Sequence, residues 1–123
     1  MLECLVVGMG GFLGSVLRYL IGKIPVNETM TFPIKTFAIN LIGSFVIGIL
    51  AALSVKYSSL NPRLVLFLKV GFCGGFTTFS TFALETSDLM QKGQTSIAVV
   101  YAVLSAVFGV LCVIGGQALI EHI

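Results

Sequence analysis

Long apolar stretches alternate with short polar connections along the chain of 123 residues. Four stretches are long enough to cross a bilayer, because a membrane-spanning helix needs about 20 apolar residues at ~1.5 Å rise each. The predicted spans are residues 2–21, 34–55, 64–90 and 95–120. Most turn formers and charges lie in the connections, and no segment remains for a second domain. The pattern predicts a single four-helix transmembrane domain over residues 1–123.

The composition excludes a water-soluble domain. Hydrophobic residues make up 57% of the chain and charged residues 10%, whereas soluble domains carry about 25% charged residues. Too few polar side chains are present to cover a water-facing surface. We therefore expect an all-α integral membrane protein that crosses the cell membrane several times and has the lipid bilayer as its surroundings.

Positive charges are divided almost evenly between the two sides of the predicted bundle. One side holds Lys56, Arg63 and Lys69, and the other holds Arg18, Lys23, Lys35 and Lys92. The lysine and arginine difference between the sides orients a helical membrane protein, and four against three gives almost no signal. Two explanations stay open: small counts in a short chain, or insertion in both orientations followed by pairing of inverted copies.

Each predicted span carries two small residues four positions apart. These pairs are Gly10/Gly14, Ser44/Gly48, Gly71/Gly75 and Ser105/Gly109. Helices in lipid associate through close backbone approach and dispersion contacts, which small residues permit. The pairs predict a tightly packed bundle and carry no information about function.

The third span contains an unusual segment, GFCGGFTTFSTFALE, at residues 71–85. Glycine costs about 1 kcal/mol relative to alanine in a helix, so Gly74 and Gly75 predict a break near residues 74–77. Irregular backbone at membrane depth is tolerated where it is buried in protein or lines a cavity. Its carbonyl groups can then hold a small cation. The segment therefore predicts a binding site inside the membrane.

Most polar side chains within the spans are hydrogen-bond donors. They are Thr36, Asn40, Thr77, Thr78, Ser80, Thr81, Tyr101 and Ser105, with Arg18 near the end of the first span. Such donors suit a small anion better than a cation. Phe79 and Phe82 share a helical face, and the positive edge of an aromatic ring can face an anion. Core packing is the other explanation for this phenylalanine pair.

Residues for enzymatic chemistry are missing from the sequence. The chain has one histidine, His122, and five carboxylates without the spacing of a metal site or a nucleophile–base pair. The three cysteines, Cys4, Cys73 and Cys112, lie in apolar segments and suit small buried side chains. We expect neither an enzyme nor a nucleic-acid-binding protein.

Three motifs resemble the Fluc family of fluoride channels, which is also called the CrcB family. They are GGFTTFSTF at residues 74–82, NLIGS at residues 40–44 and Leu17-Arg18-Tyr19. The resemblance covers essentially the whole chain, including its length and its four spans. It implies a fluoride-selective channel that exports fluoride passively and lowers cytoplasmic fluoride. It also implies an antiparallel, dual-topology homodimer with a broken third helix, which agrees with the near-even charge distribution.

The resemblance further implies roles for individual residues. Backbone carbonyls of Gly74 and Thr77 would hold a structural sodium ion (Na+) at the dimer interface, and this ion would not be transported. Ring edges of Phe79 and Phe82 would line the fluoride pathway. The other pathway residues that the resemblance implies are Asn40, Ser80, Thr81, Tyr101 and Ser105. Arg18 would lie at an aqueous vestibule and Glu85 near a pore end.

Two other functions are compatible with a small four-helix membrane protein. A drug/proton antiporter needs a membrane-embedded carboxylate, and only Glu3 and Glu85 lie in or near a span, without tryptophan in the chain. A non-transporting subunit of a larger complex needs only apolar helix faces and small-residue seams. That second alternative leaves the donors at residues 77–81 and Asn40 without an explanation.

Overall fold

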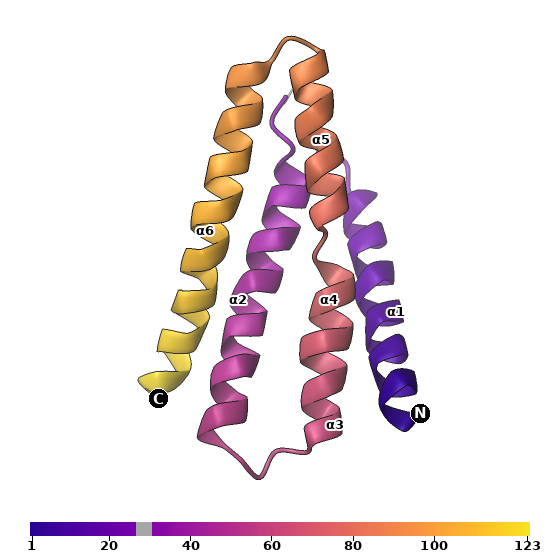
Figure 1. The fold of residues 1–123 in the computed structure, drawn as a ribbon, viewed down its shortest axis with the longest axis vertical. Coiled ribbons are helices and arrows are strands. Elements are labelled where there is room, and N and C mark those ends of the chain that lie inside the picture. Colours follow the sequence, from indigo (N-terminus) through magenta and orange to yellow (C-terminus); the bar gives the residue numbers. More distant parts are fainter. Residues whose placement is uncertain (27–30) are drawn as a thin grey trace.

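The computed structural model describes residues 1–26 and 31–123, and all regular elements in these residues are helical. Four helical segments are long and apolar enough to cross a membrane. They are α1 (Leu2–Gly22), α2 (Ile34–Lys56), the segment Pro62–Gln91 and α6 (Thr95–Glu121). The prediction of an all-helical protein with four spans is confirmed. Both termini and the α2–α3 connection lie at one end of the bundle, here called the terminal end (Figure 1). The α5–α6 connection lies at the other end, here called the loop end.

The third span is built from four consecutive elements. They are α3 (Pro62–Val65), the π-helix η1 (Leu66–Phe72), α4 (Cys73–Phe76) and α5 (Phe79–Gln91). At its start, Asn61 Oδ1 accepts a hydrogen bond from Arg63 N at 2.9 Å, and Pro62 occupies the first helical position. Both features favour helix initiation, because the cap satisfies one N–H and proline lacks an N–H that would need a partner.

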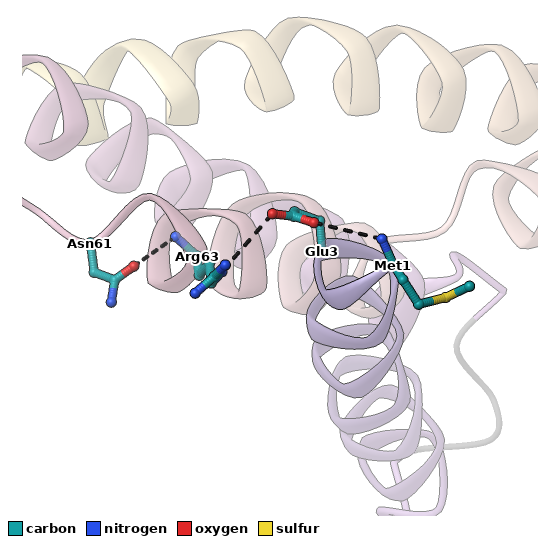
Figure 2. Close-up of polar contacts among 4 residues, drawn as sticks. All are labelled: Met1, Glu3, Asn61 and Arg63. Atoms are coloured by element: carbon teal, nitrogen blue, oxygen red, sulfur yellow. Dashed lines mark hydrogen bonds and ion pairs between the residues drawn. The ribbon is translucent and has the colours of Figure 1, made fainter.

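Polar contacts connect the start of the third span to the start of α1 (Figure 2). Arg63 Nε lies 4.0 Å from Glu3 Oε1, and the N-terminal ammonium lies 3.9 Å from Glu3 Oε2. All of these groups are exposed. Exposed ion pairs contribute at most about 1 kcal/mol, so these contacts orient the terminal end without determining the fold.

The helical path of the third span is interrupted at two threonines. Thr77 has φ −79° and ψ 156°, and Thr78 has φ −147° and ψ 118°, which are extended conformations. Gly74 and Gly75 are themselves helical, within α4, and the irregular backbone begins at Thr77, the last residue of the predicted range 74–77. Gly75 permits close contact between α4 and α1, because a Cβ atom there would overlap Gly11 O and come within 2.9 Å of Gly11 Cα.

The bundle consists of two closely packed helix pairs. In the first pair, α1 packs on η1 and α4, and a Cβ atom at Gly14 would lie 2.8 Å from Phe76 N. In the second pair, α2 packs on α6, and a Cβ atom at Gly116 would lie 2.9 Å from Ile49 N. In both pairs the backbone of one helix is in close contact with the backbone of the other, which is the arrangement that small residues permit in lipid.

The buried core is small and lies toward the loop end. Leu89, Ala98 and Tyr101 form a buried cluster, and the Phe32 and Phe82 rings pack on Tyr101 with centroids 5.3 and 5.1 Å away. Many other large apolar side chains are exposed over the outside of the bundle. An apolar exterior fits a protein whose solvent is lipid, so the described fold is that of a multi-pass membrane protein.

Candidate functional site

A side chain from α2 holds the interruption between α4 and α5. Asn40 Oδ1 accepts a hydrogen bond from Thr78 N at 2.8 Å, and Asn40 Nδ2 donates to Thr78 O at 3.0 Å. The amide of Asn40 thereby supplies partners for both backbone polar groups of Thr78. An asparagine amide has two N–H donors, so one donor of Asn40 is left without an acceptor among the residues that the structure describes.

Backbone carbonyls lose their α-helical donors at the interruption, and those of Gly74 and Thr77 are among them. In a continuous α-helix, Thr78 N would donate to Gly74 O and Thr81 N would donate to Thr77 O. Instead, Thr78 N donates to Asn40, and Thr81 N donates to Thr78 Oγ1 at 3.2 Å. The carbonyl oxygens of Gly74 and Thr77 are therefore released from the α-helical pattern. Hard oxygen ligands of this kind suit a small cation.

The start of α5 has the opposite polarity. The first N–H groups of a helix have no acceptor within it, and the helix dipole adds partial positive charge there. Thr78 caps one of these groups through its hydroxyl oxygen. Helix N-termini are favourable positions for anions. The interruption thus places carbonyls that favour a cation next to N–H groups that favour an anion.

A cavity of about 430 Å³, here called the central cavity, lies between α2, α6 and the interrupted span. It is lined by Asn40, Gly43, Ser44, Ile47, Cys73, Gly74, Thr77, Thr78, Phe79, Phe82, Ala102, Ser105 and Ala106. The Phe79 and Phe82 rings are 5.7 Å apart and tilted by 46°. Within the part of the chain that the structure describes, the buried Ser105 Oγ has no hydrogen-bond partner. The cavity therefore offers unused polar capacity beside aromatic rings.

A second cavity of about 450 Å³, here called the vestibule, lies toward the loop end. It is lined by Arg18, Tyr19, Gly22, Lys23, Lys35, Thr36, Ile39, Thr78, Thr81 and Glu85. Arg18 Nε donates to Gly75 O at 3.1 Å, and Lys35 Nζ donates to Gly22 O at 2.7 Å. Three of these lining side chains are basic and one is acidic. A cleft with an excess of positive charge raises the local concentration of anions.

Thr78 lines both the vestibule and the central cavity. Its hydroxyl donates to Thr81 Oγ1 at 3.1 Å, and within residues 1–26 and 31–123 the hydrogen of the Thr81 hydroxyl has no acceptor. The two cavities are therefore adjacent, and the extended backbone at Thr78 forms part of the wall between them.

Glu85 connects three helices next to the vestibule. Thr36 Oγ1 donates to Glu85 Oε2 at 3.0 Å, and Tyr101 OH donates to Glu85 Oε1 at 2.9 Å. Thr36 comes from α2, Glu85 from α5 and Tyr101 from α6. The Tyr101 side chain is fully buried. Both carboxylate oxygens therefore have a donor, which fixes the position of Glu85.

The structure distributes the predicted site residues over distinct places. Those that line the central cavity are Asn40, Gly74, Thr77, Phe79, Phe82 and Ser105. Those that line the vestibule are Arg18, Thr81 and Glu85. Among the described lining residues of these two cavities, neither Tyr101 nor Ser80 is present. Tyr101 contacts Glu85 instead, and Ser80 is exposed on α5.

The structure adds to the site four residues for which no individual role was predicted from the sequence, although Thr36 and Thr78 are among the polar donors of the spans. These four residues are Lys23, Lys35, Thr36 and Thr78. A signal was present for Thr78, because a threonine directly before a helical stretch is a typical N-cap. Lys23 and Lys35 lie on either side of the connection between the first and second spans, and Arg18 lies just before it. The sequence therefore already placed these three basic residues at the same end of the bundle.

Comparison with known proteins identifies the family. A family model described as "CrcB-like protein, Camphor Resistance (CrcB)" matches residues 5–117. The chain belongs to the CrcB family. Three similar proteins are each named "Fluoride-specific ion channel FluC". That of Chlorobaculum tepidum is 46% identical over 97% of this chain and 94% of its own length. That of Ruminiclostridium cellulolyticum is 46% identical over 100% and 95%, and that of Bacteroides fragilis is 44% identical over 99% and 98%.

Proposed function

We propose that this CrcB family member is a fluoride-selective channel through which fluoride leaves the cytoplasm passively. The relatives at 42–46% identity over most of the chain carry the name of a fluoride-specific ion channel. The protein is a channel-family member and not an enzyme. The observation that carries the proposal is the adjacency, at Thr78, of a positively charged vestibule and a cavity with unused hydrogen-bond donors.

Fluoride is small and strongly hydrated, so a pathway must replace part of its water shell. The second N–H of Asn40 and the hydroxyls of Thr81 and Ser105 are donors that the hydrogen bonds among the described residues leave available. Conduction requires binding that is strong enough for entry and weak enough for exit. A few neutral donors with aromatic ring edges meet this requirement better than a fixed cation inside the pathway would.

A second, antiparallel copy of the chain completes the pathway in this proposal. Phe79 is 79% exposed in the single chain although it lies in the middle of the third span. The near-even distribution of basic residues supports insertion in both orientations. In the dimer, the ring edges of Phe79 and Phe82 face the fluoride ion.

A sodium ion at the dimer interface is the structural cofactor in the same proposal. The residues that would hold it are Gly74 and Thr77, through the carbonyl oxygens that the interruption releases from α-helical hydrogen bonds. Gly74 is exposed in the single chain and has no described atom within 4 Å of a Cβ position. Such an ion would supply positive charge to balance the carbonyl oxygens and is not transported.

We expect purified protein in liposomes to release fluoride rapidly and to release no matching chloride. The measurement is fluoride efflux read with a fluoride electrode, with chloride-loaded vesicles as the control. A selective release would also exclude a non-transporting subunit, and proton release upon substrate addition would instead indicate an antiporter. Absence of fluoride release from folded protein in sodium buffer would refute the proposed function.

Replacing Phe79 or Phe82 by isoleucine is expected to lower fluoride efflux about fivefold, since an aromatic edge contributes ~1 kcal/mol to a favourable contact. Phe79→Ile is the cleaner variant, because this exposed ring loses little packing within the chain. The matched control is Phe12→Ile, at an exposed phenylalanine of α1 outside both cavities. Wild-type efflux in both Phe79→Ile and Phe82→Ile would show that the rings have no pathway role.

A further inference from the structure

We propose that Gly43 is a positioning residue for the interruption, because the space that it leaves on α2 receives the side chain of Thr77. This inference rests on the proposed function, in which the Thr77 carbonyl helps to hold a sodium ion. A Cβ atom at Gly43 would overlap Thr77 Cγ2 and lie 3.3 Å from Phe76 Cδ2. Gly43 is buried, and both Gly43 and Thr77 line the central cavity. The contact between them therefore forms part of the cavity wall.

The Thr77 side chain cannot turn away from α2 without losing a hydrogen bond. Its hydroxyl donates to Cys73 O at 2.8 Å, and Thr77 N donates to the same carbonyl at 3.0 Å. The methyl group and the hydroxyl are attached to the same β-carbon, so a rotation that moved the methyl group would also move the hydroxyl. A side chain at position 43 would therefore push the Thr77 backbone away from α2, and the Thr77 carbonyl with it.

Gly43 acts together with Asn40, which lies three residues earlier on the same face of α2. Asn40 binds the N–H and the carbonyl of Thr78, whereas Gly43 accommodates Thr77. These two threonines are the residues with extended backbone at the interruption. One of them is held by hydrogen bonds and the other by shape, so the direction of the Thr77 carbonyl depends on the glycine.

The position of the Thr77 backbone matters for a cation because the proposed ligand is a main-chain oxygen. Thr77 O is released from the α-helical pattern, since Thr81 N donates to Thr78 Oγ1 instead. Replacing a residue that orients a metal ligand typically lowers metal affinity about 10–100-fold. Gly43 does not touch the ion in this inference and acts through Thr77.

The test is a double-mutant cycle between positions 43 and 77, measured by thermal unfolding in detergent at increasing sodium chloride, with choline chloride keeping the ionic strength constant. A ligand that binds the folded state raises the unfolding temperature with its concentration. Gly43→Ala is expected to raise the sodium concentration needed for a given stabilisation about tenfold. Thr77→Ser removes Cγ2 and keeps the hydroxyl, so the double variant Gly43→Ala/Thr77→Ser should return to the wild-type sodium dependence.

Gly109→Ala is the matched control, because it adds a methyl group against α2 without a clash. Its Cβ atom would lie 3.8 Å from Ser44 Oγ, and Gly109 lines neither cavity. This variant should keep the wild-type sodium dependence. Fluoride efflux is the second readout, and it should fall in Gly43→Ala and recover in the double variant. A lower unfolding temperature of Gly43→Ala with unchanged sodium dependence and unchanged efflux would make Gly43 a packing residue only and overturn the inference.

The outcomes separate this inference from the proposed function. Wild-type protein that releases no fluoride would refute the channel function, and the sodium dependence of the variants would still decide the role of Gly43. Wild-type protein whose unfolding temperature ignores sodium would refute the sodium site, and recovery of efflux in the double variant would then decide. If Gly43→Ala does not fold, a double variant that folds with wild-type sodium dependence supports the inference. A double variant that also fails to fold overturns it.

Discussion

Asn40→Ala is expected to destabilise the folded protein by about 2–4 kcal/mol, because two backbone groups lose their partners and each unsatisfied group costs about 1–3 kcal/mol. The lost contacts are the 2.8 Å bond from Thr78 N and the 3.0 Å bond to Thr78 O. The extended backbone at the interruption would no longer be held in place. Fluoride efflux should also fall at least about tenfold, because the variant removes the Asn40 N–H donor from the proposed pathway and a hydrogen bond to a charged group contributes about 1.5–3 kcal/mol.

The measurements for this variant are thermal unfolding in detergent and fluoride efflux from liposomes. Asn40→Asp is the matched comparison, because it keeps the acceptor for Thr78 N and loses the donor to Thr78 O. Its stability should lie between those of wild type and Asn40→Ala. Equal stability of Asn40→Ala and wild type would show that the asparagine does not hold the interruption.

Gly14→Ala is expected to destabilise the protein by about 3 kcal/mol, the upper range for overpacking. The added Cβ atom would overlap Phe72 O and lie 2.8 Å from Phe76 N. Both contacts are with backbone, so no side chain can rotate away, and α1 must move from α4.

Gly8→Ala provides the control on the same helix. No described atom lies within 4 Å of a Cβ position there, and alanine is favoured over glycine in a helix by about 1 kcal/mol. This variant should unfold at or above the wild-type temperature. If both variants unfolded at the same temperature, close contact between α1 and the third span would not determine stability.

Hydropathy was sufficient to find the four spans, because length and apolarity are local properties of the sequence. The exact position of the interruption could not be predicted in this way, because glycine has two uses in a membrane helix. Gly75 could mark irregular backbone or a close helix contact, and the structure shows that it contacts Gly11. That distinction depends on which helix lies opposite, which no local pattern reports.

For the candidate site, the sequence likewise predicted which residues take part but not all of their contacts. Five residues of the motif line the central cavity together with Asn40, namely Gly74, Thr77, Thr78, Phe79 and Phe82, and the predicted pathway roles stay predictions. Tyr101 is also expected along this pathway, which stays a prediction, and its hydroxyl donates to Glu85, to which Thr36 donates as well. Such a contact depends on the rotation of three helices about their axes. Each polar residue was visible in the sequence, but its partner was not.

The interruption at Thr77 and Thr78 also determines which experiments can detect a cation at this place. The oxygens released from helical hydrogen bonds belong to the main chain of Gly74 and Thr77, so replacing side chains there leaves the ligand atoms in position. Alanine scanning would report these two residues as tolerant even if they held an ion. Amide-to-ester replacement, which weakens the carbonyl as an electron donor, addresses the atoms themselves.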